Sequence, residues 1–141
     1  MKVLLKKLNY KGQLRIAVIN SEESFYKAVA KELKGIITDN DIDQRCPYEF
    51  IIVFVKTVAD VNQLAPVALH NLTADGILWF CYPKKSSMKY SSVLERDKGW
   101  KALNDSGFYG IRMVAIDNDW SAMRFRNVKF IKSNSGKYPI Q

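Results

Sequence analysis

The segment at residues 83–92, PKKSSMKYSS, combines three lysines with four serines directly after an apolar run. If that run is a strand of an open α/β sheet, the segment begins at the carboxyl edge of the sheet, where such sheets bind ligands. Ammonium and hydroxyl donors at that edge suit a phosphate or a carboxylate. The segment therefore predicts an anion site that includes Lys84, Lys85 and Ser86, although a plain solvent-facing linker has the same composition.

Asn20 and Ser21 form the second part of this expected anion site. They follow another apolar run, residues 14–19, and precede a helical pattern. Parallel strands bring their carboxyl ends to one edge, so the two residues would lie on the same side as Lys84. Backbone N–H groups at the start of a helix can there bind an anion. Asn20 also has capping-box spacing to Glu23, which predicts that the helix begins at Asn20.

Asp117 and Trp120 form a second candidate ligand site, in a short turn between two segments near the carboxyl terminus. The structural alternative is that Trp120 anchors a hairpin to the core while Asp117 shapes the turn.

Catalytic and metal-binding residues are not expected. His70 is the only histidine, and thus the only side chain whose unperturbed pKa suits general-base chemistry near neutrality. It falls late in an amphipathic pattern, where a packing or surface role is more common than catalysis. Cys46 and Cys81 lack the spacing of metal ligands, and the acidic run DNDID lacks the glycine and glutamate of a calcium loop. The acidic run therefore predicts a solvated loop.

No cofactor is expected either. Nucleotide-binding α/β proteins hold the cofactor with a glycine-rich turn after the first strand. In this chain the strand at residues 14–19 continues into Asn20, Ser21, Glu22 and Glu23 without a glycine. No phosphate-binding loop of the type GxxxxGK[ST] occurs in the sequence.

The composition is that of an ordinary globular domain. The chain has 141 residues, of which 48% are hydrophobic and 26% charged, enough to build a core without metals or disulfides. We expect one domain over residues 1–132 and a flexible tail over residues 133–141. No apolar run could cross a bilayer and no export signal is visible, so we expect a cytoplasmic protein with no membrane partner.

The net charge of +8 is concentrated at the two ends of the chain. Clustered positive charge can attract nucleic acid or small anions, but it is equally typical of a solvated basic surface. The charge therefore does not identify a partner.

Alternating apolar patterns predict strands and helices in turn. Strands are predicted at residues 14–19, 36–38, 50–55, 77–82, 111–116 and 120–125. Helices are predicted at residues 1–8, from Asn20 to a C-cap at Gly35, from a Thr57–Asp60 cap, and at residues 93–106 with Trp100 and Leu103 buried. Pro66 predicts a kink in the third helix or two shorter helices that meet near Ala65. A turn at Asp75-Gly76 leads into the fourth strand.

These elements predict an α/β fold: a Rossmann-like three-layer sandwich whose mostly parallel sheet ends in an antiparallel hairpin. This order resembles the carboxy-terminal half of class I methyltransferases, in which a parallel sheet also ends in such a hairpin. That resemblance implies S-adenosylmethionine as a possible cofactor, and Asp39 stands where an acid would bind the ribose. The missing glycines speak against it.

Three segments carry a closer resemblance: LLKKLNYKGQLRIAVINSEESF, GILWFCYPKK and VAIDNDWSAMRFR. They resemble a bacterial family defined only as a domain of unknown function, and the resemblance covers roughly residues 4–130. It implies a fold and a bacterial cytoplasmic context. It implies no activity and no ligand.

The sequence thus favours a non-catalytic Rossmann-like domain that binds a small anionic ligand or a protein partner. One alternative is an atypical S-adenosylmethionine-dependent methyltransferase. The other is a nucleic-acid-binding module, which is the less expected partner class. For that module, Arg112, Arg124 and Arg126 alternate with apolar residues and could form a basic face on the hairpin, although a charged, protected edge strand has the same pattern.

Overall fold

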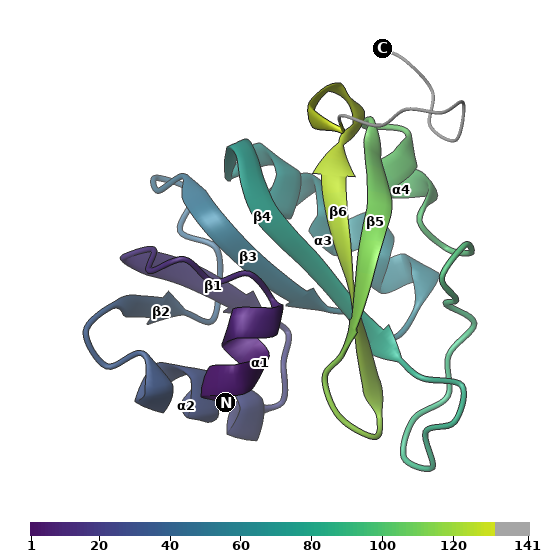
Figure 1. Ribbon diagram of the computed structural model, residues 1–141. Coiled ribbons are helices and arrows are strands. Elements are labelled where there is room, and N and C mark those ends of the chain that lie inside the picture. The colour runs from purple at the N-terminus through teal and green to yellow at the C-terminus, as the bar shows by residue number, and fades with distance from the viewer. Residues whose placement is uncertain (132–141) are drawn as a thin grey trace.

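A six-stranded mixed sheet forms the centre of the protein (Figure 1). The structure is a computed structural model that describes residues 1–131, so the expected tail at residues 133–141 lies outside the described residues. The strands are β1 (Arg15–Ile19), β2 (Ile37–Asp39), β3 (Tyr48–Phe54), β4 (Leu72–Pro83), β5 (Phe108–Ala115) and β6 (Trp120–Asn127). Their order is β2-β1-β3-β4-β6-β5; β1 to β4 are parallel, and β6 is antiparallel to β4 and β5. The mostly parallel sheet with a final hairpin is confirmed.

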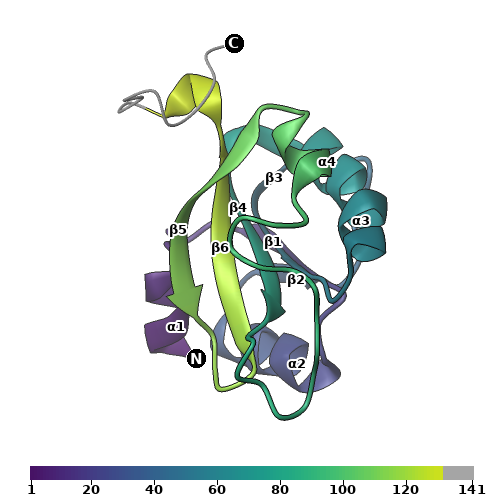
Figure 2. The same ribbon diagram turned by 90° about the vertical axis from the view of Figure 1, so that its right-hand side faces the viewer.

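Helices cover both faces of the sheet and complete three layers (Figure 2). They are α1 (Lys2–Lys7), α2 (Glu23–Glu32), α3 (Val58–His70), α4 (Lys101–Asn104) and the 3-10 helix η1 (Val128–Phe130). Leu5 of α1 and Val29 of α2 belong to the buried cluster on one face, the α1 face. Val61 of α3 and Leu103 of α4 belong to the cluster on the other, the α3 face. None of the helices within residues 1–131 is both long and apolar enough to span a bilayer.

The central strands β3 and β4 are buried on both faces. In β3 only Glu49 is exposed, and β4 is buried from Ile77 to its end. Continuous apolar runs are typical of strands that are covered on both sides. The turn expected at Asp75-Gly76 is a bulge inside β4, where Asp75 has a positive φ of 54° and the register with β3 shifts.

A long irregular segment, residues 84–100, connects β4 to α4; we call it the strap. The helix predicted over residues 93–106 is wrong, because only Lys101–Asn104 is helical. Gly99 has a φ of +103°, a conformation that a helix does not contain, and Glu95 and Lys98 form an isolated bridge just before it.

The two apolar side chains expected on that helix are nevertheless buried. Trp100 is 4% exposed and Leu103 is 0% exposed, both on the α3 face. Their spacing of three residues fits a single helical turn as well as a long helix, so the pattern predicted burial correctly and length incorrectly.

Helix α3 begins as predicted and continues through Pro66 as one helix, so the alternative of two shorter helices is wrong. The Thr57 hydroxyl accepts from the Asp60 N–H at 3.0 Å and the Asp60 carboxylate accepts from the Thr57 N–H, a complete capping box. Pro66 does not divide the helix, because it lies on the exposed side while Ala65 and Ala68 on the buried side hold both halves to the sheet.

The connection from β2 to β3, residues 40–47, crosses the sheet without a helix. It is not the solvated acidic loop that the sequence predicts. Asp39 and Asp43 are half-buried, and Arg15 of β1 donates to both, at 2.7 Å and 3.2 Å. The Tyr48 hydroxyl also donates to Asp39. Arg15, a partly exposed residue of β1, thus holds the crossover against the sheet.

Candidate functional site at the carboxyl edge

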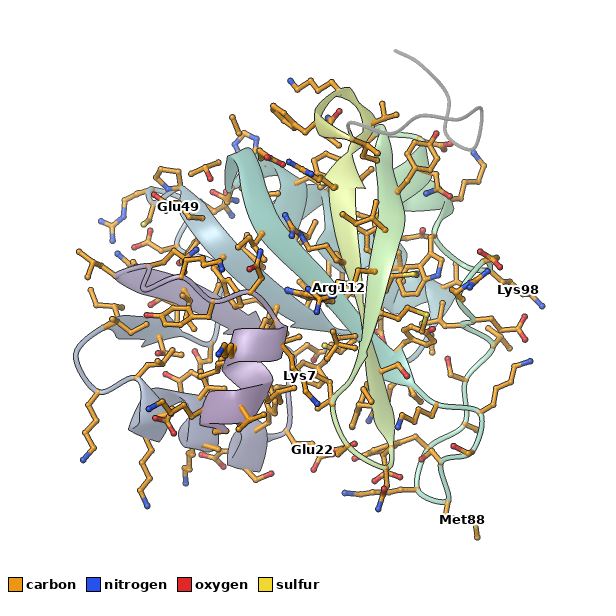
Figure 3. The ribbon with its side chains drawn as sticks, viewed as in Figure 1. Lys7, Glu22, Glu49, Met88, Lys98 and Arg112 are labelled. Carbon is orange, nitrogen blue, oxygen red and sulfur yellow. The ribbon has the colours of Figure 1, made fainter. Side chains whose placement is uncertain are left out.

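The parallel strands end together at one edge of the sheet, which we call the carboxyl edge. The β5–β6 turn lies at the same edge, because Pro83 at the end of β4 pairs with Trp120 at the start of β6. The residues that follow β1, β3 and β4 therefore meet the turn, and Figure 3 shows Glu22 and Met88 at this edge. The sequence expectation that Asn20 and Lys84 lie at one edge agrees with this topology.

Asn20 bridges two strands rather than capping a helix. Its φ is 60°, in the left-handed region that asparagine tolerates better than most residues. Its side-chain Nδ2 donates to the Phe54 carbonyl at 2.9 Å, which ties the end of β1 to the end of β3. The predicted cap at Asn20 is wrong: Glu22 is the N-cap of α2, with no side-chain cap bond. The C-cap is Leu33 instead of Gly35.

Glu22 is the point at which the strap is attached. The Tyr90 hydroxyl donates to one carboxylate oxygen of Glu22 at 2.5 Å, and the Lys89 ammonium donates to the other at 3.4 Å. The Tyr90 bond, followed by Lys89, holds the pKa of Glu22 below its usual range. Trp120 also contributes to lowering the pKa of Glu22. One carboxylate thus joins the start of α2 to the strap.

Aromatic rings fill the space beneath this attachment. The Trp120 ring lies 5.0 Å from the Phe54 ring and 5.2 Å from the Tyr90 ring, centroid to centroid. Phe25 of α2 packs against Phe54 at 4.9 Å. A cavity of about 190 Å³ remains beside them, lined by Met1, Glu22, Ser24, Phe25, Ala28, Phe54, Ile116, Asp117 and Trp120.

The predicted site residues of the strap lie at this edge, but mostly in contacts within the protein. Lys85 pairs with Glu95, and the Lys84 N–H donates to the Asp119 carbonyl at 2.8 Å. Ser86 is exposed. Within residues 1–131 no carboxylate lies within ion-pair distance of the Lys84 ammonium, so of these residues Lys84 offers the positive charge to a ligand.

The remaining predicted residues have mainly structural contacts. Asp117 Oδ1 accepts from the N–H groups of Asp119 and Trp120 at 2.8 Å and 2.9 Å, which closes the β5–β6 turn. The Ser87 hydroxyl donates to Asp119 at 2.8 Å and so ties the strap to that turn. The Ser21 hydroxyl donates to the Glu22 carbonyl. These contacts shape the edge and do not by themselves identify a ligand.

The remaining candidate residues and hollows of the described chain lie away from the carboxyl edge. His70 lies at the far end of α3, at the opposite edge of the sheet, and is exposed. Within residues 1–131 no group of three His, Cys, Asp or Glu side chains could hold a metal ion. A hollow of about 430 Å³ lies between the strap and β5, with Arg96, Trp100 and Met123 in its lining.

The sequence analysis missed Glu22 and Tyr90 as a pair. They are 68 residues apart, and neither has a local pattern that predicts the other. The only usable signal was that both the turn after β1 and the segment after β4 must lie at the carboxyl edge.

The Glu22 attachment predicts a pH-dependent strap. The pKa of Glu22 is lowered from 4.5 in the folded protein, so its contribution is present above the ordinary carboxyl range and is lost as the pH falls through the lowered value. Hydrogen exchange of the amides at residues 87–90 should therefore accelerate in acid relative to the amides of β3. In Glu22→Gln this acid dependence should be weaker, because within residues 1–131 only the Ser87–Asp119 bond still links the segment to a carboxylate. An identical acid dependence in Glu22→Gln would show that Glu22 does not hold the strap.

Comparison with known proteins supports the fold assignment. No family model and no curated protein matches the chain. Among solved structures, an S-adenosylmethionine-dependent methyltransferase from Aquifex aeolicus has a TM-score of 0.56 and 12% identity, covering 90% of this chain and 89% of that one.

Two further methyltransferases are similar to the chain. The ribosomal protein L11 methylase from Lactobacillus delbrueckii subsp. bulgaricus has a TM-score of 0.54 and 16% identity, covering 89% of this chain and 75% of its own. The N-methyltransferase NodS from Bradyrhizobium japonicum WM9 has a TM-score of 0.51 and 15% identity, covering 80% of this chain and 73% of its own. At such identities the likeness shows the fold: the chain has the Rossmann-like fold of S-adenosylmethionine-dependent methyltransferases.

Proposed function

We propose that this chain is a non-catalytic binding domain built on the methyltransferase fold. The observation that carries the proposal is that the chain fills the carboxyl edge with its own side chains, because Tyr90 and Trp120 cover Phe54 and Glu22 anchors them. The remaining cavity of about 190 Å³ is smaller than the roughly 300–1,000 Å³ of ordinary small-molecule sites.

The groups at this edge also argue against acid–base chemistry. Glu22 accepts from Tyr90 and Lys89, and its lowered pKa makes it a weak base near neutrality. The only histidine, His70, lies at the other edge of the sheet. The proposed role is therefore to bind a ligand or partner rather than to transform it.

An atypical S-adenosylmethionine-dependent methyltransferase is the second candidate. The fold of the structural neighbours, taken alone, favours this candidate over a non-catalytic role. A second observation supports it: Asn20 has a φ of 60°, so the turn after β1 contains the left-handed conformation that glycine usually supplies.

The ligand of a binding domain is a small anion or a protein partner. For an anion, we propose a site at the carboxyl edge that consists of Asn20, Ser21, Lys84, Lys85 and Ser86. The negative charges of Glu22 and of the aspartates in the β5–β6 turn would repel an anion there and weaken its binding. We also propose membership of the bacterial family of unknown function and a cytoplasmic location, which the free thiols of Cys46 and Cys81 support. Burial raises the pKa of the Cys81 thiol, which makes it unreactive.

Calorimetric titration with S-adenosylmethionine separates the two candidates. A non-catalytic domain with an occupied edge should give no saturable heat up to about 1 mM ligand, the concentration at which even a binding free energy near −4 kcal/mol would be visible. Micromolar, saturable binding would establish the second candidate. A parallel titration with S-adenosylhomocysteine, which lacks the positive sulfonium, shows whether any heat depends on that charge.

A further inference from the structure

Three arginines, Arg112, Arg124 and Arg126, lie on the β5–β6 hairpin, and only Arg126 forms an ion pair within residues 1–131. Arg112 of β5 and Arg124 of β6 are direct cross-strand partners, so both side chains lie on the same face of the sheet. Trp79 of β4 is the partner of Arg124 on its other side, and Trp79 belongs to the buried cluster of the α1 face. The two arginines therefore lie on the α1 face.

This part of the α1 face is open. In Figure 1 helices α1 and α2 lie over β1 to β3, and no helix within residues 1–131 lies over β5 and β6 on that side. Figure 3 shows Arg112 on this face; it also labels Lys7, the last residue of α1. A ligand could approach the arginines from this side.

Arg126 shows what an arginine here does when an acid is available. It donates two hydrogen bonds of 2.7 Å to the two oxygens of Asp75, which the β4 bulge presents. This bidentate geometry engages both carboxylate oxygens, and Arg126 lowers the pKa of Asp75. Asp75 thus bonds directly to Arg126, whereas it acts on Arg124 through its charge.

Among residues 1–131, no acid lies within ion-pair distance of the Arg124 guanidinium, whereas Arg126 has Asp75. The Arg124 Nε is closed to solvent and has no hydrogen-bond partner within residues 1–131. Burial, followed by the charge of Arg126, lowers the pKa of Arg124; the charge of Asp75 opposes this in part, and Arg112 adds to the repulsion. Arginine stays charged in proteins, and like charges directly opposite in a sheet are destabilising. The pair therefore lowers the stability of the folded protein as long as no anion is bound between the two guanidinium groups.

We propose that Arg112 and Arg124 bind a phosphate group on the open α1 face of the hairpin. A phosphate monoester carries about −1.5 to −2 charges and three acceptor oxygens, which suits two guanidinium groups on neighbouring strands. A carboxylate suits one arginine, as Asp75 does Arg126. The site is independent of the carboxyl edge and of whether S-adenosylmethionine binds. The phosphate belongs either to a small phosphate ester or to a nucleic-acid backbone.

The test uses inorganic phosphate as the probe and the purified full chain. Phosphate should raise the melting temperature at constant ionic strength, relative to chloride. In Arg112→Met and Arg124→Met the phosphate affinity should fall about tenfold or more, as expected when a charged hydrogen bond is lost. Lys31→Met, near the exposed end of α2, removes one positive charge elsewhere and should keep the response.

A second measurement separates binding from a structural role. Without phosphate, Arg124→Met should unfold at the same or a higher denaturant concentration than the natural protein, because the substitution removes an unpaired half-buried charge and keeps the apolar stem. Arg112 is exposed, so Arg112→Met folds in any case. The proposal is overturned if phosphate does not stabilise the natural protein, if both variants respond fully, or if Arg124→Met is destabilised without phosphate.

An oligonucleotide titration identifies the source of the phosphate. If the source is a nucleic-acid backbone, the affinity should fall with salt, and each of the two arginine variants should reduce the salt slope by about one. If the source is a small ester, inorganic phosphate binds and the oligonucleotide does not. Loss of the phosphate response only in Lys84→Met would overturn the proposal in favour of the carboxyl edge.

Discussion

Replacing Trp79 with alanine is expected to lower the free energy of unfolding by about 3–5 kcal/mol, the usual cost of removing a large aromatic side chain from a core. Trp79 is 0% exposed, and its indole Nε1 donates to the Leu8 carbonyl at 2.8 Å. The substitution therefore leaves a cavity and also removes the contact that holds the end of α1 on the sheet. Denaturant unfolding followed by circular dichroism measures the loss.

Two further variants separate these contributions. Trp79→Phe keeps an aromatic ring but leaves the Leu8 carbonyl without its donor, at a cost of about 1–3 kcal/mol. Leu14→Ala is the control, because Leu14 is 77% exposed and its loss should change stability by less than about 0.5 kcal/mol. If Trp79→Ala cost no more than Leu14→Ala, α1 would not be docked as described.

Trp120→Ala is expected to lower stability by a similar amount, about 3–5 kcal/mol, and also to release the strap. Trp120 is 5% exposed and contacts both Phe54 and Tyr90. Its removal takes away the surface on which the strap packs. Hydrogen exchange under native conditions should show that amides at residues 87–90 gain more exchange than those of β3.

Tyr90→Phe is the matched control for the strap. It keeps the ring against Trp120 and loses only the hydroxyl that donates to Glu22. Because this contact is exposed, the stability loss should be within about 1 kcal/mol, while strap exchange still rises. Unchanged strap exchange in folded Trp120→Ala would refute the packing described for this edge.

The sheet could be predicted from the sequence because its signals are local. The apolar runs that became β3 and β4 are continuous, as expected for strands buried on both faces. The turn at Asp117-Asn118-Asp119 separates the two hairpin strands as predicted. The Thr57–Asp60 cap also depends only on residues three apart.

The site could be predicted only in part, because its contacts are long-range. Asn20 has the local spacing of a helix cap, but its amide is used by the Phe54 carbonyl, 34 residues away. Likewise, Arg15 reaches acids 24 and 28 residues along the chain, which turned an expected solvated loop into a packed crossover. Local propensity gives way where a tertiary partner offers the same polar group a buried bond.

We propose that the strap and the aromatic rings fill the carboxyl edge and leave too little room there for a cofactor. The three tryptophans report on it separately. The indole of Trp79 donates to Leu8 and that of Trp100 to Glu95, both away from the edge, whereas Trp120 lies beside Glu22. An NMR spectrum of the indole N–H groups, recorded with and without about 1 mM S-adenosylmethionine, is therefore the most direct test. We predict that all three resonances stay in place; a saturable shift of the Trp120 resonance, with Trp79 and Trp100 unchanged, would contradict the account.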